Sequence, residues 1–117
     1  MTEYDPHEAI NYIYNHRKAY AKARGQLAQL ECYKSSLKAI MMKKSGEQTI
    51  GAQEREAYAS EEYVNLGHAI GEATEQVEDM KFALEAAKMR FQAWQTESAN
   101  NRQLEKFTVW LLYLKNY

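Results

Sequence analysis

The sequence predicts an all-α protein built as a long antiparallel helical hairpin, coiled-coil-like, with a short connecting helix and an apolar C-terminal segment. The strongest observation is an uncharged ladder in which apolar residues follow one another at steps of three and four. This average step of 3.5 residues keeps one stripe of a helix facing a partner helix. The chain also contains one Pro and five Gly in 117 residues, which favours long uninterrupted helices. The rungs of the ladder are Tyr63, Leu66, Ile70, Ala73, Val77, Met80, Leu84, Ala87, Phe91 and Trp94.

The first long helix is predicted to run from Pro6 to about Lys44. Asp5 can accept hydrogen bonds from free backbone N–H groups, and Pro6 suits the first helical position. Lys43 and Lys44 near the negative helix end, with Gly46 just beyond, predict its termination. A less regular apolar stripe, interrupted by cations, follows this helix and consists of Ile10, Ile13, Tyr20, Leu27, Leu30, Leu37 and Met41.

The connection between the two long helices is predicted to contain a loop over residues 45–51 and a short helix over residues 52–59. Ser60 followed by two glutamates is typical of a helix start, so the second long helix should run from there to about Asn100 or Arg102. Two helices of similar length with a short connection predict an antiparallel hairpin. We therefore assign residues 1–102 to one helical hairpin domain.

Residues 103–117 form a separate apolar tail. Nine of the last fourteen residues are apolar or aromatic, namely Leu104, Phe107, Val109, Trp110, Leu111, Leu112, Tyr113, Leu114 and Tyr117. The tail is too short to span a bilayer and lacks the Lys/Arg-rich face of a membrane-surface helix. Because a helix that is apolar on most sides requires burial, the tail should either fold onto the hairpin or mediate self-association. We expect a homo-oligomer, with candidate contacts at Phe107, Trp110, Leu111 and Leu114.

Composition narrows the cellular setting. The formal net charge of −1 excludes a uniformly basic nucleic-acid-binding chain. The single Cys32 cannot form an internal disulfide and suits a reducing compartment, where we expect it to be a small buried residue. The acidic, polar N-terminus predicts no secretory signal. We therefore expect a cytoplasmic protein that does not enter a membrane.

Charge is sorted along the chain. Residues 6–44 carry eight cations and two acids, residues 45–80 one cation and nine acids, and residues 81–117 six cations and three acids. In an antiparallel hairpin the lysines before the loop can neutralise the acidic start of the second helix. The cations at the other end have no such balance, and the aromatics Tyr12, Tyr14, Tyr20, Phe91 and Trp94 are expected near them.

Cations interleaved with aromatic rings are typical of single-stranded nucleic-acid binding, because cations track phosphates while rings stack bases. The candidate nucleic-acid-binding residues are Arg17, Lys18, Lys22, Arg24, Lys88, Arg90 and Arg102. The same pattern also fits solvated helix faces, with Phe91 and Trp94 serving as rungs of the hairpin core.

Signatures of catalysis are absent from the sequence. There is no Gly-rich phosphate loop, no paired-Cys zinc signature and no Ser-His-Asp arrangement. His68, Glu72 and Glu75 share a helix face and could contact a metal, but such residues on an acidic helix are more often solvated. We expect a protein that is not an enzyme, with no catalytic residues, no metal and no cofactor.

Several segments resemble the UvsY-like recombination mediators of phages and their relatives, over roughly residues 33–102. These segments are Thr49 with Glu54-Arg55-Glu56-Ala57-Tyr58-Ala59, Tyr63, Leu84-Glu85-Ala86-Ala87-Lys88-Met89-Arg90-Phe91-Gln92-Ala93-Trp94 and Ser98-Ala99-Asn100-Asn101-Arg102. The resemblance implies an oligomeric phage protein that binds single-stranded DNA and helps load a recombinase in place of a single-strand-binding protein. It also implies that Lys88, Arg90 and Arg102 contact phosphates. Gln95 stands where relatives carry Arg, and the tail lies outside the match.

The leading hypothesis is therefore a non-enzymatic accessory protein of phage DNA recombination or replication, acting in the cytoplasm of an infected bacterium. A second interpretation is a protein-interaction module that inhibits a host factor or a defence nuclease by imitating nucleic-acid phosphates. Its candidate contacts are Glu54, Glu56, Glu61 and Glu62. A third interpretation is a structural coiled coil within a virion or a larger assembly.

Overall fold

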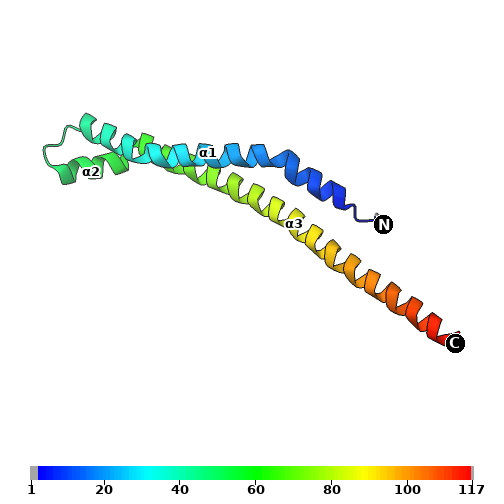
Figure 1. Ribbon diagram of the computed structural model, residues 1–117. Helices are drawn as coiled ribbons and strands as arrows, with labels where there is room; N and C mark the ends of the chain where they lie inside the picture. The colour runs from blue at the N-terminus through cyan, green and yellow to red at the C-terminus, as the bar shows by residue number, and fades with distance from the viewer. Residues whose placement is uncertain (1–2, 117) are drawn as a thin grey trace. The chain divides into compact units, whose positions relative to one another are not determined.

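The computed structural model describes residues 3–116 and is all-α (Figure 1). The helices are α1 (Pro6–Lys44), α2 (Ile50–Ala59) and α3 (Glu61–Lys115), and the described residues contain no strand. This order confirms the predicted helical hairpin with a short connecting helix. Met1, Thr2 and Tyr117 lie outside the described residues, so the outermost positions of the predicted N-terminus and tail are not covered.

The chain divides into two compact units, to which both long helices contribute. The hairpin unit is Arg17–Phe82, and the terminal unit combines residues 3–16 with residues 83–116. The hairpin unit therefore contains most of α1, all of α2 and the first part of α3. The terminal unit contains the start of α1 and the remainder of α3.

The helix starts follow from local hydrogen bonding. The Asp5 side chain accepts a hydrogen bond from the backbone N–H of His7 at 2.9 Å, which caps α1 as predicted. Thr49 caps α2 by accepting from the N–H of Ala52 at 3.1 Å. Because of this cap, α2 begins at Ile50, two residues before the predicted start. Ser60 accepts from the N–H of Tyr63 at 3.3 Å and begins α3, as predicted.

The loop after α1 closes through Ser45. Its hydroxyl donates to the Glu56 carboxylate at 2.8 Å and accepts from the backbone N–H of Glu47 at 3.1 Å. No described glycine has a positive φ, so α1 ends without a left-handed Gly46. The backbone N–H of Ser45 donates to the carbonyl of Met42 at 3.2 Å, which satisfies one of the free carbonyls at the end of α1.

The core of the hairpin unit is the seam, meaning the stripe where α1 and α3 face each other, shown in cyan and green in Figure 1. Leu66 and Val77 are its buried residues on α3, and Ala23 and Leu37 are those on α1. Every predicted rung from Tyr63 to Trp94 is buried or half-buried. The regular ladder therefore identifies the packed face of α3 from Tyr63 to Trp94.

The predicted stripe of α1 needs one correction. Ile10 is 47% exposed, whereas its neighbour Ala9 is buried. With Ala9 and Ala23 included, the α1 seam has the same alternating steps as α3, through Ala9, Ile13, His16, Tyr20, Ala23, Leu27, Leu30, Lys34, Leu37 and Met41. The small alanines allow the two helices to approach closely. The heptad register of α1 is not apparent when only its large apolar residues are considered.

The predicted end of the second long helix was also wrong. Instead of ending near Arg102, α3 continues without a break to Lys115. Every described residue from Asn100 onward is exposed. The apolar tail is therefore a continuation of α3 rather than a separate element.

Candidate nucleic-acid interface

The register of the seam defines two edges along the hairpin. In heptad notation, with Ile13 and Tyr63 at a positions, residues at e and g flank the seam on either side. Reversing the direction of one helix exchanges its sides, so e positions of α1 share an edge with e positions of α3, and g with g. Tyr12 and Arg90, both at g, line one groove of the terminal unit, which agrees with this register.

The e edge of the hairpin unit is cationic. Arg17 and Arg24 occupy successive e positions of α1, and Lys81 occupies an e position of α3; all three are exposed. Residues 17–30 contain no carboxylate, whereas on α3 Glu78 precedes Lys81 by three residues. Lys81 was missed in the sequence analysis, although extending the heptad assignment across both helices would have found it.

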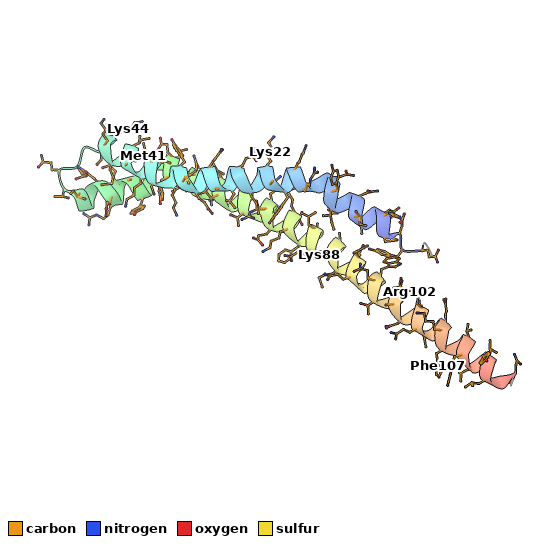
Figure 2. All side chains as sticks on the ribbon, viewed as in Figure 1. Lys22, Met41, Lys44, Lys88, Arg102 and Phe107 are labelled. Atoms are coloured by element: carbon orange, nitrogen blue, oxygen red, sulfur yellow. The ribbon has the colours of Figure 1, made fainter. Side chains whose placement is uncertain are left out.

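Two further predicted residues lie on the outer face of α1. Lys18 and Lys22 are one helical turn apart and exposed. Figure 2 shows Lys22 on the side of α1 that faces away from α3. Neither lysine forms an ion pair within residues 3–116. Arg24 lies 5.9 Å from the centre of the Tyr20 ring, a cation–π contact that holds the guanidinium near the seam.

The remaining predicted cations, Lys88, Arg90 and Arg102, belong to the terminal unit, and all are exposed on α3. They are separated along the chain from the cations of the hairpin unit, so the predicted gathering of both groups at one end stays a prediction. Lys88 nevertheless occupies the e position that follows Lys81 in the heptad order.

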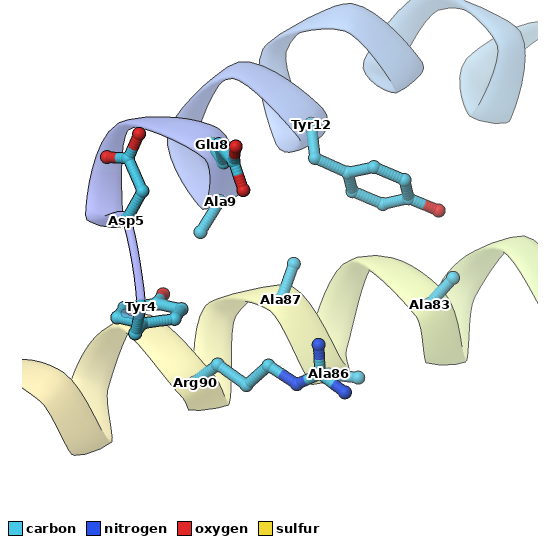
Figure 3. Close-up of a pocket in the computed structure, with 9 residues that line it drawn as sticks. All are labelled: Tyr4, Asp5, Glu8, Ala9, Tyr12, Ala83, Ala86, Ala87 and Arg90. Carbon is cyan, nitrogen blue, oxygen red and sulfur yellow. The ribbon is translucent and has the colours of Figure 1, made fainter. Parts of the chain in front are cut away.

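Arg90 shares its groove with carboxylates. The groove has a volume of about 390 Å³ and forms where small alanines of α3, Ala83, Ala86 and Ala87, face the first turns of α1. Figure 3 shows the Arg90 side chain along α3, with Asp5 and Glu8 at the N-terminal end of α1 on the opposite side of the groove. The g edge of the terminal unit therefore mixes charges, in contrast to the e edge of the hairpin unit.

Charge at the closed end of the hairpin is compensated within the chain. Lys38 of α1 lies 3.6 Å from the Glu54 carboxylate and 4.7 Å from the centre of the Tyr58 ring, both on α2. A hydrogen bond with Tyr58 raises the pKa of Lys38, opposed by partial desolvation and assisted by the Glu54 charge. The acid that contacts Lys38 therefore belongs to the short helix α2, and the expected neutralisation of the start of α3 stays a prediction.

The four predicted acidic contacts differ in their surroundings. Glu54 pairs with Lys38, and Glu56 accepts the hydroxyl of Ser45. Glu61 and Glu62 stand exposed in the first turn of α3. Two of the four carboxylates therefore help to close the hairpin, where their charge is shared with a partner in the same chain.

The predicted aromatic partners separate into two groups. Phe91 and Trp94 stack at 5.9 Å and are half-buried rungs of the seam. Tyr12 stacks on His16 at 4.0 Å, and Tyr14 is 61% exposed. Tyr12 and Tyr14 are therefore the rings that solvent can reach, whereas Tyr20, Phe91 and Trp94 are half-buried residues of the seam.

Other reactive groups do not gather. No three His, Cys, Asp or Glu side chains within residues 3–116 lie close enough to hold a metal ion, and His68, Glu72 and Glu75 are included in that range. Cys32 is exposed, which corrects the expectation that it is buried. Among the described helices, none has both the length and the apolar character required to cross a membrane.

The fold defines the class of this protein as an all-α helical hairpin, distinguished by a cationic edge on one unit and a long exposed helix end on the other. Comparisons with protein-family models, curated proteins and solved structures find no match to this chain.

Proposed function

We propose that this protein is a non-enzymatic accessory factor that binds single-stranded DNA along the e edge of the hairpin unit. The observation that carries the proposal is the placement of Arg17, Arg24 and Lys81 at e positions, without a carboxylate in the facing stretch of α1. Like charges on one edge repel each other, and a phosphate backbone lying along the edge relieves that repulsion while releasing counterions.

The e edge is suited to binding a single DNA strand because its cations lie in a row and the half-buried ring of Tyr20 lies next to one of them. Lys18 and Lys22 extend the positive surface around α1, and Tyr20 lies beside Arg24. Stacking on tyrosines is tolerant of sequence, so the expected binding is largely independent of base order. Self-association would multiply individually weak sites into useful avidity.

The resemblance to UvsY-like mediators adds a role to this binding. Under the proposal, the protein holds single-stranded DNA in a phage-infected bacterial cytoplasm and assists a recombinase in replacing a single-strand-binding protein. The contrasting interpretation, an acidic docking module, has less support because Glu54 and Glu56 are engaged by Lys38 and Ser45 in the same chain.

The test is a fluorescence-anisotropy titration of the full chain with a labelled thymidine oligonucleotide at several salt concentrations. The double variant Arg24→Ala/Lys81→Ala should weaken binding at least tenfold at low salt. The matched control Lys43→Ala/Lys44→Ala removes the same charge from the closed end and should change binding little. Absence of binding by the unaltered chain at low salt, or equal losses in both variants, overturns the proposal.

A further inference from the structure

The exposed end of α3 is the most apolar surface of the described chain. All eight of its large apolar side chains are between 46% and 66% exposed, namely Leu104, Phe107, Val109, Trp110, Leu111, Leu112, Tyr113 and Leu114. Phe107 and Trp110 stack at 6.2 Å without covering each other (Phe107 is labelled in Figure 2). A helix end with this composition requires a partner to exclude water.

The tail belongs to a second ladder on α3, here called the back stripe. Its members again follow steps of three and four and carry no charge: Met89, Ala93, Thr96, Asn100, Gln103, Phe107, Trp110 and Leu114. All eight are exposed. The back stripe therefore has the spacing of a helix-packing face over the length of α3 in the terminal unit, although nothing covers it.

The back stripe lies on the opposite side of α3 from the seam. The seam pair Phe91 and Trp94 recurs sixteen residues later as Phe107 and Trp110. At 3.6 residues per turn, sixteen residues rotate a side chain by roughly 160°. Phe91 and Trp94 are half-buried against α1. Phe107 and Trp110 repeat this pair of rings on the opposite side of α3, where no helix packs on them.

We propose that a second copy of this chain covers the back stripe as an antiparallel partner, with residues 89–114 of the two α3 helices paired about a two-fold axis. In this register Trp110 packs on Ala93 of the second copy, Phe107 on Thr96, and Leu114 on Met89. Each contact occurs twice, as an isologous interface requires. The central pair is Asn100 with Gln103, whose side-chain amides can donate and accept hydrogen bonds mutually.

The antiparallel direction follows from the sizes of the side chains. Small or slender residues occupy the first half of the back stripe, and large rings occupy the second half. A parallel pair would set Trp110 on Trp110 at one end and Ala93 on Ala93 at the other, so the helices would diverge and leave voids. The antiparallel pair sets the two rings on small residues, Trp110 on Ala93 and Phe107 on Thr96, which permits the density of a packed interior.

The amount of surface is adequate for a specific dimer. Phe and Trp side chains each offer roughly 150–250 Å², and the two copies contribute two of each, all about half exposed. Leu104 and Leu111 flank the stripe and widen the contact. With the leucines and methionines of both chains, the interface reaches on the order of 1,000 Å², the size that separates specific interfaces from casual contacts.

The first test is the solution mass of the full chain, by light scattering or sedimentation equilibrium. We expect twice the monomer mass of 13.6 kDa. Leu114→Glu, in the back stripe, should shift the dimer dissociation constant at least a hundredfold. Leu112→Glu is the matched control, because Leu112 is also exposed, 55% against 47% for Leu114, but faces roughly 160° away from Leu114. Either of two results overturns the proposal. One is a chain that is still monomeric at about 100 µM, and the other is an equal effect of the two substitutions on the dimer dissociation constant.

The second test fixes the direction of the pair, in a Cys32→Ser background that removes the native thiol. Chains carrying Met89→Cys and Leu114→Cys should form a disulfide with each other when mixed and oxidised, and neither should cross-link with itself. Self-cross-linking of each variant, without the mixed product, indicates a parallel pair and overturns the assignment. Helicity measured by circular dichroism should be unchanged in all variants. DNA binding is not involved, so this outcome is independent of the proposed function.

Discussion

The Nζ atom of Lys38 lies 3.6 Å from Oε1 of Glu54, and this ion pair joins α1 to α2 at the closed end of the hairpin unit. The Tyr58 ring lies against the same ammonium group, 4.7 Å away. One cation thus contacts a carboxylate and an aromatic ring from successive turns of a ten-residue helix. The contact fixes the short helix, which has few buried residues of its own.

The stabilisation from Lys38 should disappear at alkaline pH. Tyr58 first, and Glu54 with it, raise the pKa of Lys38 above its ordinary value of 10.5. A group whose pKa is raised by folding contributes its full stabilisation below the unfolded-state pKa, and loses it as pH rises through the folded-state pKa. Urea unfolding should therefore separate the unaltered chain from Lys38→Met at pH 8, with the difference closing above about pH 10.5. A difference that persists at higher pH would contradict the charge-based account.

Ala57 should not tolerate a larger side chain. It is completely buried, with 0% exposure, where α2 meets the long helices of the hairpin unit. Ala57→Leu inserts three carbons into a filled site and should lower the free energy of unfolding by about 1–3 kcal/mol. Ala59→Leu on the exposed side of α2 is the control and should have little effect. Chemical denaturation at fixed protein concentration measures both, and equal stability of the two variants would argue against tight packing there.

Two valines of α3 offer a direct test of the seam. Val77 is 6% exposed and belongs to the ladder, whereas Val64 is 47% exposed and lies outside it. Val77→Ala removes two buried carbons at about 0.8 kcal/mol each, partly offset by the better helix propensity of Ala. Val64→Ala should be neutral or slightly stabilising, because only propensity changes. Thermal unfolding followed by circular dichroism should give a lower midpoint for Val77→Ala than for the unaltered chain, and an equal or slightly higher midpoint for Val64→Ala.

Most of the fold could be predicted because the ladder on α3 is nearly free of interruption. The seam of α1 was predicted less well, because two of its buried residues are the small Ala9 and Ala23. The larger Ile10 was assigned to the seam although it is exposed. The end of α3 was misplaced because its seam becomes polar after Trp94, at Ser98 and Asn101. The helix continues there on local propensity while the apolar face moves to the back stripe.

The candidate interface was predictable in part. Counting cations along the chain identified Arg17 and Arg24, because sorted charge is visible in any sequence. Lys81 was counted with the third segment but was not grouped with Arg17 and Arg24, because only the heptad register of both helices shows that the three share e positions. The pairing of Lys38 with Glu54 depends on the angle at which α2 packs, which no local pattern specifies.

Salt dependence should reveal how many phosphates the cationic edge contacts. For single strands, the logarithm of the binding constant falls with the logarithm of salt concentration by about 0.7 per phosphate neutralised. Arg24→Ala/Lys81→Ala should therefore reduce this slope by about 1.4 if each residue contacts one phosphate. Lys43→Ala/Lys44→Ala should leave the slope unchanged, because those residues lie at the closed end. A slope that is the same in all three proteins would mean that DNA binds elsewhere, even if affinity falls. Leu114→Glu, measured in the same way, distinguishes the contribution of the cationic edge from that of self-association. Loss of the dimer should lower the affinity through lost avidity, while the cations on each edge are unchanged.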